Sequence, residues 1–122
     1  MREVPTDKAR EKRITMEIVV DSYSGNELAM GWYYYLEGIL QFPFWARCVR
    51  RRVVSPLRPG DEVEVIRMAP EEECVHEMLV MIQWERRTLA VPLSQLEGIK
   101  ADKKTYQAIG DWRYWVRKGY EF

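Results

Sequence analysis

The sequence has few of the residues that stabilise secreted or metal-dependent small proteins. It contains one histidine and two cysteines, Cys48 and Cys74, among 122 residues. Two cysteines do not make a disulfide framework, so we expect free thiols and a cytoplasmic location. The charged start of the chain lacks the apolar segment of a signal peptide, and no apolar stretch approaches the roughly 20 residues that span a bilayer. We therefore expect a protein that is neither secreted nor anchored in a membrane.

Catalytic motifs are also missing. The chain has no G-x-S-x-G, no P-loop and no H-E-x-x-H pattern. Carboxylates are plentiful, but nothing in the sequence sets one apart as an acid with a shifted pKa. We therefore predict a protein that binds a ligand and is not an enzyme.

The composition is that of one ordinary globular domain. Hydrophobic residues make up 47% of the chain and charged residues 31%, and there are five tryptophans and seven tyrosines. A chain of this length can bury a core without disulfides or metals. We expect a single domain over residues 1–122, with residues 1–5 frayed.

The N-terminal part predicts two helices. Thr6 or Asp7 can cap a helix that runs to about Ser22, although the apolar residues 14–20 also alternate as in a strand. Ser24 and Glu27 form a capping box ahead of an apolar run, which predicts a helix over residues 26–40. The aromatic run at residues 32–35 widens the apolar face of this second helix so much that we expect it to be nearly buried.

The remainder of the chain predicts short strands and one last helix. We expect strands at residues 45–54, 62–65, 78–84 and 87–91, a turn at 56–60 and a 3₁₀ turn at 92–96. Asp102 can cap a helix that ends near Lys118, with Gly119 as its stop. The expected fold is α+β: an N-terminal helical pair, a small SH3-like β-barrel of four or five short antiparallel strands, and a C-terminal helix. The SH3-like likeness is an analogy of fold and carries no function.

Charge is strongly segregated in a chain whose formal net charge is zero. Residues 44–60 hold five arginines and no acid. Residues 61–77, which we call the acidic segment, hold seven acids against Arg67 alone, a net charge of −6. The total therefore predicts no partner, whereas the distribution points to the acidic segment.

The acidic segment is a candidate calcium site. Calcium is a hard cation that takes about six to eight oxygen ligands, often clustered carboxylates and loop carbonyls. Glu71, Glu72 and Glu73 lie on a predicted loop, Glu62 and Glu64 share one face of a predicted strand, and no EF-hand pattern is present. The alternative is a solvated acidic loop that pairs with the neighbouring arginines.

Two other binding sites remain open on the residues alone. Cys74 and His76, with Cys48 brought alongside, would offer zinc an incomplete set of ligands. Arg50, Arg51 and Arg52 could bind phosphates and Trp45 could stack on a base, although consecutive strand residues point to alternating faces. The aromatic runs are interpreted as core, and an exposed remainder would indicate a protein-binding patch.

Longer stretches of the sequence resemble the small calcium-binding proteins of CcbP type, best known from cyanobacteria. The similar segments are E-I-V-V-D-S-Y at residues 17–23, M-G-W-Y-Y-Y-L-E at 30–37, F-P-F-W-A-R-C at 42–48, P-L-R-P-G-D-E-V-E-V-I at 56–66, M-A-P-E-E-E-C at 68–74, R-T-L-A-V-P-L-S-Q-L-E at 87–97 and D-W-R-Y-W-V-R-K-G-Y-E-F at 111–122. The resemblance covers roughly residues 10–122.

The resemblance implies a small soluble calcium buffer or sensor that coordinates the ion through acidic side chains. The candidate ligands are Glu37, Asp61, Glu62, Glu71, Glu72 and Glu73. Members of that family tend to be strongly acidic and often carry a second acid after the position of Glu37, where this chain has Gly38. The alternatives are an SH3-like protein-interaction module without metal, which would have an unidentified protein partner, and a weak nucleic-acid binder that uses the arginine run.

Overall fold

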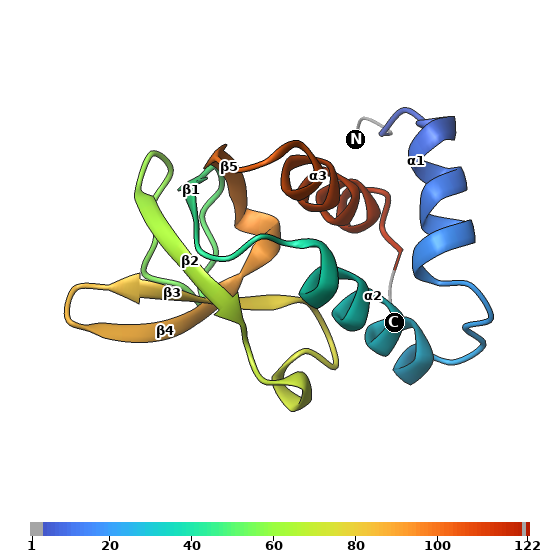
Figure 1. The fold of residues 1–122 in the computed structure, drawn as a ribbon, viewed down its shortest axis with the longest axis horizontal. Helices are drawn as coiled ribbons and strands as arrows, with labels where there is room; N and C mark the ends of the chain where they lie inside the picture. The colour runs from blue at the N-terminus through green and yellow to red at the C-terminus, as the bar shows by residue number, and fades with distance from the viewer. Residues whose placement is uncertain (1–3, 121) are drawn as a thin grey trace.

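The computed structural model describes residues 4–120 and 122, in which three helices lie beside one antiparallel sheet (Figure 1). The expected fraying of residues 1–3 lies outside the described residues, and residues 4 and 5 belong to no element. The elements in chain order are α1 (Lys8–Arg13), the π-helical η1 (Ile14–Ile18), α2 (Gly25–Ile39), β1 (Phe44–Cys48), β2 (Glu62–Met68), the 3₁₀ turn η2 (Glu71–Glu73), β3 (Leu79–Trp84), β4 (Arg87–Pro92), the 3₁₀ turn η3 (Leu93–Gln95), β5 (Leu96–Lys100) and α3 (Lys103–Arg117). The α+β class is confirmed.

The five strands form one open sheet in the order β4-β3-β2-β1-β5. Every pair is antiparallel, and the register shifts once between β1 and β5 and once between β2 and β3. Such irregularities bend and twist strands, which gives the sheet its strong curvature. Within the described part of the chain no ladder joins the edge strands β4 and β5, so the expected closed SH3-like barrel is not confirmed.

Local capping chemistry starts and stops the two long helices as expected. The Ser24 side chain accepts a hydrogen bond from the Glu27 backbone N–H at 3.2 Å, and the Asp102 side chain accepts one from the Thr105 N–H at 2.8 Å. Gly119 follows α3 with φ of 83°, the left-handed conformation that a glycine stop provides.

The N-terminal segment is helical and its part η1 contacts α2, but the expected helical pair is not confirmed. Arg10 and Arg13 of α1 both bind the carboxylate of Asp111 on α3, with N···O distances of 2.6 to 2.7 Å. Asp111 is fully buried, and the Arg10 guanidinium lies 2.8 Å from where a Cβ on Gly110 would be. Gly110 therefore leaves the space through which Arg10 reaches Asp111, and α1 is anchored to α3.

Aromatic and aliphatic side chains of α2, α3 and the sheet share one core. Trp32 of α2 is fully buried and packs edge-on against Trp112 and Trp115 of α3, with ring centroids 5.0 and 5.6 Å apart. Val65 and Ile82 face the core from β2 and β3 and are also fully buried. The interpretation of most aromatic residues as core is confirmed for these rings.

Two further expectations about the elements are wrong. The first strand does not reach residue 54, because β1 ends at Cys48 and the arginine run lies in a loop. The backbone of Cys48 pairs with Gly60 and Asp61, while Val49 donates to the Gln95 carbonyl, so the chain leaves the β1–β2 ladder there.

No helix of the described residues is long and apolar enough to cross a membrane.

The second wrong expectation concerns α2, which is not nearly buried. Trp32 and Leu36 are fully buried, but Tyr34 is 55% exposed, and Glu37 and Gly38 also face solvent. Successive helix residues are rotated by about 100°, so the consecutive aromatic residues 32–35 cannot all face the core. The exposed face of α2 looks toward the acidic turn η2.

Candidate metal centre

Two tyrosines join α2 to the chain that follows β2. The Tyr33 hydroxyl donates to the Ala69 carbonyl at 2.8 Å, and this contact is buried. The neighbouring Tyr34 hydroxyl donates to the carboxylate of Glu71 on η2. The rings of the two tyrosines pack edge to face, with centroids 5.6 Å apart. These contacts place the exposed face of α2 against the first residues of the acidic turn.

Three carboxylates surround this tyrosine pair. The pKa of Tyr33 is raised to about 12, first by burial and then by the charges of Glu37, Cys74, Glu71 and Glu72. The pKa of Tyr34 is also raised, first by its hydrogen bond to Glu71 and then by partial desolvation and the charges of Glu71 and Glu37. Glu37 from α2 and Glu71 and Glu72 from η2 are therefore all near enough to Tyr33 for their charges to act on its hydroxyl.

We call this region the α2–η2 edge; it comprises Tyr34, Glu37, Glu71, Glu72 and Glu73. All five side chains are exposed. Among the described residues none of the four glutamates has an arginine or lysine within ion-pair distance, whereas Glu62, Glu77, Glu97 and Asp111 each do. The edge therefore keeps its negative charge, which favours a cation.

The other predicted ligands lie at the opposite end of β2. Glu62 begins this strand and pairs with Arg47 at 3.3 Å, while the Asp61 carboxylate accepts the Arg58 backbone N–H at 2.9 Å. The seven residues of β2 separate Glu62 from the turn that carries Glu71. At about 3.3 Å per residue that separation is roughly 20 Å, so the two groups of acids cannot share one ion.

The donor set of the α2–η2 edge fits a hard cation. Its ligand atoms are carboxylate and phenol oxygens, with backbone carbonyls of the turn beside them, and calcium prefers such oxygens. In the part of the chain that the structure describes, no three Asp, Glu, His or Cys side chains are already gathered closely enough to hold a metal ion. Exposed glutamates can rotate, so ion binding at this edge would draw the carboxylates together.

The side chains of the two alternative sites, the zinc candidates and the arginine run, make other contacts in the structure. Cys48 accepts a hydrogen bond from Gln95 and is buried, and Cys74 is buried against the Leu79 backbone, where burial raises the pKa of its thiol. His76 is exposed. The described residues therefore do not bring the zinc candidates together. Arg52 forms an ion pair with Glu77 at 2.8 Å, as the pairing of arginines with the acidic segment predicts.

Sequence reasoning missed Tyr34 as a member of the site. Its assignment to the core rested on the aromatic run as a whole. The residue lies three positions before Glu37 on α2, and this spacing places both side chains on one helix face. That spacing to the charged Glu37 indicates that Tyr34 lies on the polar face of α2.

Comparisons with known proteins give a family and two similar solved structures. A family model described as calcium binding, CcbP, matches residues 12–116. The crystal structure of Anabaena CcbP is similar with a TM-score of 0.87 and 40% sequence identity, over 100% of both chains. A calcium-binding protein in its calcium-binding form is similar with a TM-score of 0.86 and 39% identity, again over 100% of both chains. A comparison with curated proteins found no match.

Proposed function

The chain belongs to the CcbP family of calcium-binding proteins, and from that premise we propose that it binds calcium reversibly at the α2–η2 edge. The protein is a calcium binder without an EF-hand. The observation that supports this location is the hydrogen bond from the Tyr34 hydroxyl of α2 to Glu71 of η2, beside glutamates that have no ion-pair partner among the described residues.

We assign the ion to Glu37, Glu71 and Glu72, with Glu73 next to them on η2. Carboxylates from two elements give the ion ligands on two sides, and turn carbonyls and water complete a set of oxygens. Asp61 and Glu62 lie outside this site because of their distance along β2 and their contacts with the 47–58 region. Glu37 and η2 are thus linked through the ion as well as through the tyrosine contacts.

The affinity follows from the same geometry. The carboxylates are exposed and not yet gathered, so binding must order several side chains at a cost of about 0.5–1.5 kcal/mol each. The lack of a second acid at Gly38 removes one further charge from the edge. We propose a buffer or sensor of moderate affinity, located in the cytoplasm and performing no chemical step.

Neither alternative function is favoured. Arg47 and Arg52 are held in ion pairs with glutamates, and the arginine run lies on a loop instead of a flat strand surface. The open sheet removes the fold analogy on which the SH3-like interaction module rested. The comparisons support calcium as the ligand.

Calorimetric titration of chelator-stripped protein with calcium tests the proposal, with magnesium as the control. Magnesium demands a tighter octahedral shell and gives up its water reluctantly, so a flexible edge of glutamates should prefer calcium. Saturable heat with calcium that magnesium does not reproduce is expected. A flat calcium trace into the millimolar range would show that this chain does not bind the ion.

A further inference from the structure

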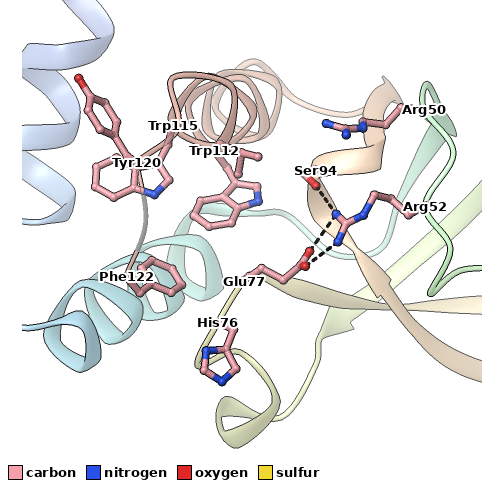
Figure 2. Close-up of a pocket in the computed structure, with 10 residues that line it drawn as sticks. Arg50, Arg52, His76, Glu77, Ser94, Trp112, Trp115, Tyr120 and Phe122 are labelled. Atoms are coloured by element: carbon pink, nitrogen blue, oxygen red, sulfur yellow. Dashed lines mark hydrogen bonds and ion pairs between the residues drawn. The ribbon is translucent and has the colours of Figure 1, made fainter.

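The molecule has a second candidate site, a pocket of about 470 Å³ between α3 and the loop after β1 (Figure 2). Its volume lies within the range of small-molecule pockets, about 300–1,000 Å³. None of the glutamates assigned to the ion lines this pocket. The argument for it is therefore independent of the proposed calcium site.

One wall of the pocket is aromatic. Four rings line it, and they are those of Trp112, Trp115, Tyr120 and Phe122. The Trp112 and Phe122 rings lie 5.8 Å apart, and the Trp115 and Tyr120 rings 4.8 Å apart. Figure 2 shows these rings gathered on one side of the pocket. Such a wall suits the face or edge of a flat apolar ring.

The opposite wall carries two arginines, Arg50 and Arg52, and one glutamate, Glu77. Arg52 is fixed there by Glu77, at 2.8 and 3.2 Å, and by the Ser94 hydroxyl at 3.2 Å. Arg50 lines the same wall and forms no ion pair among the described residues. The Arg52–Glu77 pair balances its own charge, so Arg50 supplies the positive charge that is left for a ligand.

A buried donor in the pocket wall has no partner among the described residues. Trp112 is 2% exposed, and its indole N–H makes no hydrogen bond to this part of the chain. Figure 2 shows the indole nitrogen on the side of the ring that faces Ser94 and Arg52. Buried donors are nearly always satisfied, so an acceptor atom belongs on this side of the ring.

We propose that this pocket binds a small organic anion that combines a flat ring with a phosphate or carboxylate group. The ring packs against the aromatic wall, and the anionic group accepts hydrogen bonds from Arg50. The Trp112 N–H donates to an acceptor that joins the two parts. Charge-assisted hydrogen bonds from arginine to such groups are strong and directional.

Fluorescence titration with the probe 8-anilinonaphthalene sulfonate, a flat-ringed anion, tests the proposal on the whole protein. Adenosine monophosphate, adenosine and inorganic phosphate then serve as competitors. The monophosphate, which has both ring and anion, should displace the probe, whereas adenosine and phosphate alone should each compete at least about tenfold more weakly. Equal competition by inorganic phosphate would contradict the proposal, because it would show a charge site without a ring subsite.

Two variants with the same change of charge separate the pocket from general electrostatic attraction. Arg50→Gln should weaken probe and monophosphate binding about tenfold. Arg86→Gln removes an exposed arginine from the β3–β4 turn, away from the pocket, and should leave both affinities unchanged. Absence of saturable binding, or equal losses in the two variants, would overturn the assignment. Near-ultraviolet circular dichroism should confirm that both variants keep the native aromatic packing.

Discussion

Replacing Glu71 by glutamine should weaken calcium binding without unfolding the protein. Glu71 is exposed, and its carboxylate is engaged by the Tyr34 hydroxyl and by no arginine or lysine of the described chain. Glutamine keeps the length of the side chain and an oxygen that can still accept the tyrosine hydrogen bond. The variant therefore removes one negative charge and little else.

The size of the effect follows from the distance between ion and charge. A carboxylate in contact with a divalent cation at about 2.4 Å gains roughly 3 kcal/mol even in a medium with the dielectric constant of water. The amide oxygen recovers part of that energy, so the expected loss is about 1.5–3 kcal/mol, or roughly ten- to hundredfold in Kd. Calorimetric calcium titration of the variant measures it directly.

Glu62→Gln is the matched control for this variant. Glu62 begins β2, and its separation of roughly 20 Å from η2 exceeds the Debye length of about 8 Å. Its charge then contributes less than about 0.1 kcal/mol to an ion at the α2–η2 edge. A loss of affinity in Glu62→Gln that equals the loss in Glu71→Gln would refute the location of the site.

Further predictions concern the same edge and the stability of the fold. A Cβ on Gly38 would meet no atom within 4 Å, so Gly38→Asp should tighten calcium binding several-fold by calorimetry and Gly38→Asn should not. Calcium should lower the pKa of Tyr34, because the ion takes over the Glu71 carboxylate that raises it, and an unchanged tyrosinate absorbance titration would contradict this. The pKa of Tyr33 is raised from 10.0 to about 12, so its contribution to stability is complete below pH 10 and is lost toward pH 12. Tyr33→Phe should therefore reduce the fall in the free energy of unfolding between pH 10 and pH 12. Asp111→Asn should cost about 3 kcal/mol in urea unfolding, since it leaves two arginines of α1 without their buried partner, and a loss below about 1 kcal/mol would show that this network is not needed.

Features of the fold that depend on neighbouring residues were predictable. Ser24, Asp102 and Gly119 act within one turn of a helix end, and their hydrogen bonds or dihedral angles are as expected. Features that depend on distant pairing were not predictable in the same way. β5 was not among the four strands placed by residue number, because it is defined by its pairing with β1, and the strand expected at 45–54 is shorter because its second half has no strand partner.

The candidate site shows the same division. The sequence identified a run of acids, but it could not show that β2 separates Asp61 and Glu62 from Glu71 and Glu72. It also could not show that Glu37 reaches the same place as the turn, since that depends on how α2 packs on β2. The resemblance to calcium-binding proteins suggested Glu37, and the tyrosine contacts now give a physical reason for its position.

Backbone amide NMR of isotope-labelled, chelator-stripped protein during a calcium titration tests the central claim most directly. The account predicts saturable shifts centred on residues 33–38 and 70–74, with small changes at 61 and 62 and no equivalent response to magnesium. Shifts centred on Asp61 and Glu62, or no shifts up to millimolar calcium, would contradict it.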